Sequence, residues 1–316
     1  MNSEILYVTQ QGPAWDWRVA LDLFLGGAGV GAILFSIFVD EYFKGKYRRI
    51  CHTAAWLGPI LVGLGLFFLV LKMGRPFHLF NSYLNFNPLS PLWWGGIFQP
   101  ILLVLGFVYA LKWHEAQEQD DTRRKLGRIL APVAIIVGAY HGLLLAVNVS
   151  RPLWNTGPTV LAAILGFLTT GIAAVMVVHL FRMKKAGRLD NEEHVKNFLN
   201  DMIVVRNILV GGILLQLTTF FLWWLSLKYG SLLDKEALAL ANEHYGPMFW
   251  FMGIGIGLVI PLLMGAYAVL KDKTADTKFQ IMIVTTTSIL ILVGGFFFRL
   301  AVVLAGQVEI PFKVFF

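Results

Sequence analysis

Long apolar runs alternate with short polar stretches along the whole chain. Each run holds about 20 residues, the length that an α-helix needs to cross a hydrocarbon core of about 30 Å. The pattern predicts an all-α integral membrane protein with eight transmembrane helices, at about residues 19–39, 54–71, 92–111, 129–148, 158–181, 207–227, 248–270 and 281–303. No linker or low-complexity segment separates the runs, so the sequence predicts one transmembrane domain over residues 1–316.

The polar connections between the runs alternate in charge. The connections after the first, third, fifth and seventh runs hold 18 Lys and Arg residues, whereas the two ends and the other three connections hold 7. Positively charged loops stay on the cytoplasmic side of a membrane, so both termini are predicted on the non-cytoplasmic side. The net charge of +7 is thereby explained, and we expect membrane lipids and no nucleic acid as partners.

Composition agrees with an apolar surrounding. The chain is 57% hydrophobic and 14% charged, with a mean hydropathy of +0.67, whereas soluble proteins carry about 25% charged residues. Cys51 is the one cysteine, which excludes an intrachain disulfide and an iron–sulfur cluster held by cysteines of this chain. The proline-punctuated connections 72–91 and 149–158 are predicted either to cap the bundle or to be ordinary interfacial loops.

Four polar residues fall inside the apolar runs at one depth. Asp22, Tyr140, His141 and Arg299 come from three runs, and each lies within roughly 5–12 Å of the outer interface at about 1.5 Å per residue. Ionisable groups at such depth are costly and are treated as functional until a partner explains them. A quinone site needs donors for two carbonyl oxygens and groups that exchange two protons. The alternative is an Asp22–Arg299 ion pair, or a snorkelling Arg299, with Tyr140 and His141 as packing residues.

Other polar or small residues have simpler explanations. Only His141 and His179 among the histidines lie inside runs, roughly 15–20 Å apart along the membrane normal, so we expect no haem and no metal site. Gly27 and Gly31 are expected to let two helices approach closely. Gln216, Thr218 and Thr219 either form packing hydrogen bonds or hydrate a proton path.

Four stretches together resemble the NrfD/PsrC family, the membrane subunits of polysulfide-reductase-type complexes. They are WDWRVALDLFLGGAGVGA at 15–32, KMGRPFHLFNSYLNFNPLSPLWWGG at 72–96, AYHGLLLAVNVSRPLWNTGP at 139–158 and GGFFFRLAVVLAGQ at 294–307. The stretches keep the family's order and cover the sequence from end to end. The resemblance implies two four-helix bundles, both termini outside, and a multi-pass protein of the prokaryotic inner membrane.

The resemblance also implies a function and its partners. A quinone (menaquinone or ubiquinone) would bind near the outer face, where a ferredoxin-like iron–sulfur subunit with [4Fe–4S] clusters docks. A catalytic subunit, a molybdopterin enzyme or a multihaem cytochrome, would lie beyond it. Tyr140 and Asp22 are the best-matched site residues, and Arg299, Asn85 and Arg75 are added as quinone-binding candidates. His141 stands where many members carry a small hydroxyl residue, so it is either an added proton donor or a local variation.

The expected function is therefore that of a quinone-linked subunit of a respiratory oxidoreductase, with quinol oxidation favoured over quinone reduction. Two other classes of protein fit the pattern of runs. A secondary transporter would show paired broken helices and charges at the midplane, and Gly58–Pro59 and Pro261 are such interruptions. A purely structural anchor would tolerate replacement of Tyr140, His141 and Asp22 without loss of activity while the complex still assembles.

Overall fold

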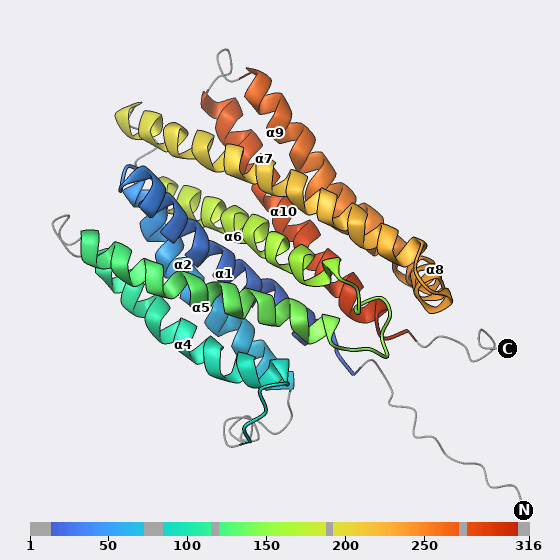
Figure 1. The fold of residues 1–316 in the computed structure, drawn as a ribbon. Coiled ribbons are helices and arrows are strands. Elements are labelled where there is room, and N and C mark those ends of the chain that lie inside the picture. Colours follow the sequence, from blue (N-terminus) through green and yellow to red (C-terminus); the bar gives the residue numbers. More distant parts are fainter. Residues whose placement is uncertain (1–13, 73–84, 115–119, 188–191, 272–276, 309–316) are drawn as a thin grey trace, which may run out of the picture.

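Helices account for nearly all of the described residues in the computed structural model (Figure 1). The structure describes residues 14–72, 85–114, 120–187, 192–271 and 277–308. The helices are α1 (Trp17–Phe43), α2 (Arg48–Lys72), α4 (Pro91–Lys112), α5 (Asp120–Ala146), α6 (Pro158–Lys185), α7 (Glu192–Lys228), α8 (Leu232–Gly246), the π-helix η4 (Pro247–Val259), α9 (Ile260–Lys271) and α10 (Thr277–Ala305).

Within these residues, eight helical stretches are long and apolar enough to cross a membrane, which confirms the predicted spans. The stretch Leu232–Lys271 joins α8, η4 and α9 into one such span. Several helices extend well beyond the apolar runs, and α7 begins at Glu192 although its run begins near residue 207. Helix α8 was not expected as an element, because its composition is polar; a capping box between Ser231 and Asp234 starts it.

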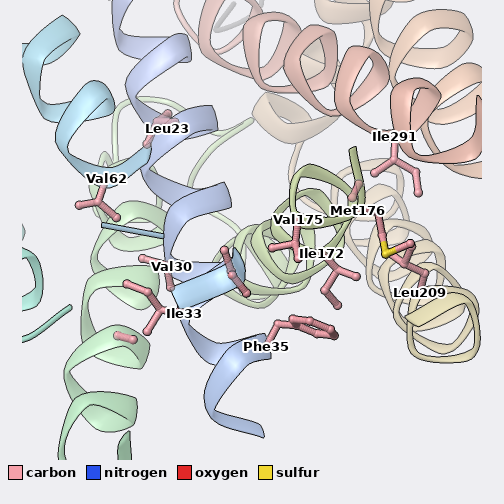
Figure 2. Packing of buried hydrophobic residues seen from close by; sticks show 14 of the residues in the cluster. Leu23, Val30, Ile33, Phe35, Val62, Ile172, Val175, Met176, Leu209 and Ile291 are labelled. Atoms are coloured by element: carbon pink, nitrogen blue, oxygen red, sulfur yellow. The ribbon is translucent and has the colours of Figure 1, made fainter. Parts of the chain in front are cut away.

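Helix α1 is the most buried of the spans and packs against α2, α5, α6 and α10. In Figure 1, α6 runs between the group α1, α2, α4 and α5 and the group α7, α9 and α10. Figure 2 shows the buried side chains that α1, α2, α6, α7 and α10 contribute to the shared core, including Leu23, Val30, Ile33, Phe35, Val62, Ile172, Val175, Met176, Leu209 and Ile291.

Small residues allow this core to close. A Cβ on Gly27 would overlap the Phe167 ring, and one on Gly31 would overlap the Phe167 carbonyl of α6. The close helix packing predicted for these two glycines is confirmed. It brings α6, with its polar residues, directly against the first helix.

The start of α1 and the end of α10 lie together at one end of the bundle. The side-chain oxygen of Gln307 accepts from the Trp15 amide at 2.8 Å, and its amide nitrogen donates to the Trp15 carbonyl at 2.7 Å. The α5–α6 loop joins them: Arg151 donates to the Gln307 carbonyl at 3.0 Å, and Trp154 Nε1 donates to the Val302 carbonyl at 2.7 Å. The capping role predicted for residues 149–158 is thus confirmed; residues 73–84 of the other loop lie outside the described residues.

Candidate functional site

Asp22, Tyr140 and His141, which the sequence singles out, lie close together near the end of the bundle that holds Trp15 and Gln307. Asp22 on α1 and His141 on α5 are buried, with exposed fractions of 1% and 0%. A Cβ placed on Gly26 would lie 3.2 Å from His141 Nε2 and 3.7 Å from Asp22 Oδ1. The absence of a side chain at Gly26 therefore leaves the imidazole and the carboxyl group facing the same small space.

Asp22 is a buried carboxyl group, and one of its oxygens lacks the hydrogen bond that normally offsets the cost of burial. Its Oδ1 accepts no hydrogen bond within the described residues, and a Cβ on Gly65 of α2 would lie 3.0 Å from that oxygen. Buried polar atoms are nearly always paired, and exceptions occur where function or a bound molecule requires them. Asp22 thus combines burial with an unused acceptor next to His141.

The hydrogen bonds of His141 define what its two nitrogens can do. Nδ1 lies 2.7 Å from the Val137 carbonyl, which can only accept, so Nδ1 carries a proton. In the neutral ring Nε2 is then an acceptor, and the Gln99 amide nitrogen lies 3.5 Å from it. Gln99 is buried on α4, and its side chain was not singled out from the sequence because an amide near the start of an apolar run is unremarkable there.

Tyr140 is fixed beside the imidazole. The ring centroids of Tyr140 and His141 are 4.9 Å apart, and a Cβ on Gly95 of α4 would overlap the Tyr140 ring. Gly95 belongs to the tryptophan–glycine stretch WWGG, so this motif supplies the space for the phenol. Tyr140, His141 and Asp22 are therefore brought together by α1, α4 and α5.

A cavity of about 70 Å³ is lined in part by His141. At about 10–15 Å³ per water-sized probe, it has room for roughly five waters or a small ring. Its walls are mostly apolar and aromatic, with a few polar side chains from α6, α7 and α10. The lining residues include Leu23, His141, Leu153, Thr159, Gly166, Phe167, Thr170, Gln216, Phe220, Trp223, Gly253, Phe298 and Arg299.

Arg299 also lines the cavity. Its guanidinium donates to the Gly295 carbonyl at 2.9 Å and to Thr170 Oγ1 at 3.3 Å, and it lies 5.1 Å from the centre of the Phe167 ring. The ion-pair alternative is wrong, since neither Asp22 nor Arg299 has a salt bridge within the described part of the protein. Snorkelling is also wrong, because the exposed fraction of Arg299 is 9%.

Of the remaining polar candidates from the sequence, Gln216 lines the cavity and the others do not line it or lie outside the described residues. Gln216 lines the cavity and accepts from Thr169 Oγ1 at 2.7 Å, whereas Thr218 and Thr219 donate to carbonyls of their own helix, as packing hydrogen bonds do. Asn85 is exposed before α4 and does not line the cavity among the described residues. Arg75 lies outside the described residues.

This arrangement suits an aromatic molecule that exchanges protons. The cavity offers apolar walls for a ring together with an imidazole and a guanidinium donor, which is the composition of a small-molecule site. Across the described residues, no group of three or more His, Cys, Asp or Glu side chains is placed to hold a metal ion. The cavity lining fits an aromatic ring that carries oxygen substituents, as a quinone does.

A family profile and individual relatives point to the same protein family. The sequence profile of the family described as "Polysulphide reductase, NrfD" matches residues 7–311. The sequence is 24% identical to the C subunit of polysulfide reductase from Wolinella succinogenes, over 93% of this protein and 94% of that one. It is 27% identical to the NrfD homolog of Haemophilus influenzae, over 94% and 95%. It is 21% identical to the Hdr-like menaquinol oxidoreductase integral membrane subunit of Archaeoglobus fulgidus, over 89% and 68%.

Proposed function

The chain belongs to the NrfD family of polysulphide reductase membrane proteins, and from this membership we propose that it is the quinone-reacting subunit of a respiratory oxidoreductase complex. The observation that carries the proposal is the position of His141, which lines the cavity and also faces Asp22 across Gly26. A relative named as a menaquinol oxidoreductase subunit supports a quinol as the substrate.

The residues of the site have distinct tasks in this proposal. A quinol supplies two electrons and two protons when it is oxidised. His141 accepts a proton at Nε2, because its Nδ1 proton is held by the Val137 carbonyl. Asp22, whose Oδ1 is unused, receives a proton near the same space. Tyr140 positions the imidazole by ring contact, and its phenol hydroxyl donates a hydrogen bond to a quinone oxygen.

Arg299 stabilises negative charge on the substrate and does not itself accept a proton. Its guanidinium lines the same cavity as His141 and has no carboxylate partner among the described residues. A fixed positive charge in an apolar site stabilises negative charge that develops on a substrate oxygen. Arg299 therefore favours loss of a proton from a hydroxyl group that points toward it.

The proposal includes the orientation and the partners of the protein. With positive loops inside, the end formed by Trp15, Trp154 and Gln307 faces the non-cytoplasmic side, with both termini there and the helices in two four-helix bundles. A ferredoxin-like iron–sulfur subunit docks at this end and accepts the electrons, and a molybdopterin or multihaem catalytic subunit lies beyond it. The naming of a relative as one lettered subunit of polysulfide reductase supports assembly with further subunits.

The test is quinol-dependent electron transfer in the purified complex. His141→Ala, Tyr140→Phe and Asp22→Asn are compared with His114→Ala and Tyr109→Phe, which lie at the opposite end of the bundle on or just after α4. We expect the three site variants to lose quinol activity, while the assembled complex still reduces its terminal substrate with an artificial electron donor. The two control variants keep quinol activity.

The same experiment separates the competing functions. Full quinol activity in His141→Ala and Asp22→Asn, with the subunits assembled, would leave this protein as a structural anchor or move the quinone elsewhere. A transporter would instead show solute-dependent flux without electron transfer. The clustering of Asp22, His141 and Arg299 toward one end, rather than at the midplane, argues against that class.

A further inference from the structure

A second cavity lies at the end of the bundle opposite the proposed quinone site. Its volume is about 420 Å³, and it is formed where α2 begins and where α4 and α6 end. These helix ends lie together at the upper left of Figure 1. The lining residues are Arg48, Arg49, His52, Thr53, Trp113, His179, Arg182, Met183 and Ala186.

The lining is strongly basic. It contains three arginines and two histidines, and none of the described lining residues carries a carboxylate. Asp120 accepts from Arg48 at 2.7 Å and also pairs with Arg123, and Asp201 lies 3.8 Å from His179, whereas neither Arg49 nor Arg182 forms a salt bridge with a described residue. The cavity therefore keeps a net positive charge that calls for an anion.

Neutral groups hold the Arg182 side chain in place. Arg182 donates to Thr53 Oγ1 at 2.8 Å and lies 3.4 Å from His52 Nδ1, so its other nitrogens remain available for a ligand. Trp113 lines the same cavity with an exposed fraction of 4%. Its Nε1 donates no hydrogen bond to any described residue. A buried indole donor and a forked guanidinium donor together suit a tetrahedral oxyanion.

We propose that this cavity binds a phosphate ester, carried by the headgroup of an anionic phospholipid. The cavity opens at the ends of membrane-spanning helices, at the end of the bundle where Lys and Arg accumulate, which is the depth of lipid headgroups. Below it, α2 and α4 expose apolar side chains that can contact acyl chains, among them Ile60, Leu64, Phe107 and Leu111. Free phosphate shares the headgroup's chemistry but would not use this apolar surface.

The test measures binding to the full-length protein purified in a neutral detergent. Phosphatidylglycerol, phosphatidylcholine and inorganic phosphate are titrated separately, and bound adducts are counted by native mass spectrometry. We expect saturable binding of phosphatidylglycerol in preference to phosphatidylcholine. Removal of one cavity arginine, in Arg49→Gln or Arg182→Gln, weakens binding roughly fivefold, the effect of about one basic side chain at a membrane surface.

Lys184→Gln is the matched control, since Lys184 is an exposed cation on the same last turn of α6 and does not line the cavity. Trp113→Phe tests the indole donor while keeping an aromatic ring. Inorganic phosphate that binds and is lost in Arg182→Gln would support the phosphate site but assign it to a free anion. Equal binding of both lipids, or equal losses in Lys184→Gln and Arg182→Gln, would overturn the proposal.

Discussion

Glycines decide the geometry of the site at the scale of single residues. Gly26 separates His141 from Asp22, and Gly95 accommodates the ring of Tyr140. A methyl group at Gly95 would occupy space that the Tyr140 ring now uses, and one at Gly26 would crowd the His141 imidazole. These positions therefore constrain the site as firmly as the polar residues do, although they carry no chemistry of their own.

Gly95→Ala tests this constraint. A Cβ there would overlap the Tyr140 ring, so the ring must shift or the helices must separate. Overpacking of this kind costs about 1–3 kcal/mol, and we expect lower thermal stability together with reduced quinol-dependent activity. Gly211→Ala on α7 is the control, because a Cβ at Gly211 meets no atom within 4 Å. Equal activity in Gly95→Ala and Gly211→Ala would contradict the assigned position of Tyr140.

At the scale of helices, charged pairs tie α1 to its neighbours at both of its ends. Near the end of α1, Arg123 of α5 donates to Asp40 at 3.0 and 2.8 Å, and both side chains are almost fully buried. Near its start, Asp16 accepts from Arg18 and pairs with Lys72 at the end of α2 at 3.1 Å. Each pair ties one end of α1 to a neighbouring helix.

Asp40→Ala removes one half of the buried pair. The remaining guanidinium of Arg123 would be left with Asp120 as its acidic partner. Breaking a buried pair costs about 3–5 kcal/mol, so we expect a clear loss of stability in thermal unfolding of the detergent-purified protein. Glu41→Ala breaks the neighbouring exposed pair with Arg128 and is expected to cost less than about 1 kcal/mol. A similar effect of both changes would contradict the burial of the Asp40 pair.

The Asp16 pair predicts a dependence on pH. Burial alone would raise the pKa of Asp16, but hydrogen bonds from Arg18 and Lys72 lower it from 3.8 to about 2. Because the pKa is lower in the folded protein, the stabilisation is complete above about pH 4 and disappears as pH falls toward 2. We expect wild type to melt at a higher temperature than Asp16→Asn at pH 6, and the difference to vanish near pH 2. A constant difference across this range would exclude the pair as its source.

At the scale of the whole molecule, the apolar runs predict the eight spans because the bilayer imposes one length on every crossing. The residues Asp22, Tyr140, His141 and Arg299 are also predictable, since polar groups stand out in an apolar run. Which of them lie together is not predictable, because this depends on how the helices rotate: Asp22 faces His141, while Arg299 lines a cavity and contacts Thr170. The hydrophobic pattern does not predict the π-helix η4 either. Two of its glycines, Gly253 and Gly257, line that cavity.

The orientation of the molecule is the prediction that links its two cavities. If Lys- and Arg-rich connections are cytoplasmic, the quinone site lies near the outer face and the basic cavity in the inner leaflet. With the C-terminus outside the cytoplasm, a fluorescent protein fused after Phe316 should not fluoresce, and alkaline phosphatase at the same position should be active. A fluorescent protein inserted between Ala186 and Gly187, after α6, should instead be fluorescent. Fluorescence from the fusion after Phe316 would reverse the orientation, placing the electron-accepting subunit in the cytoplasm and the basic cavity outside.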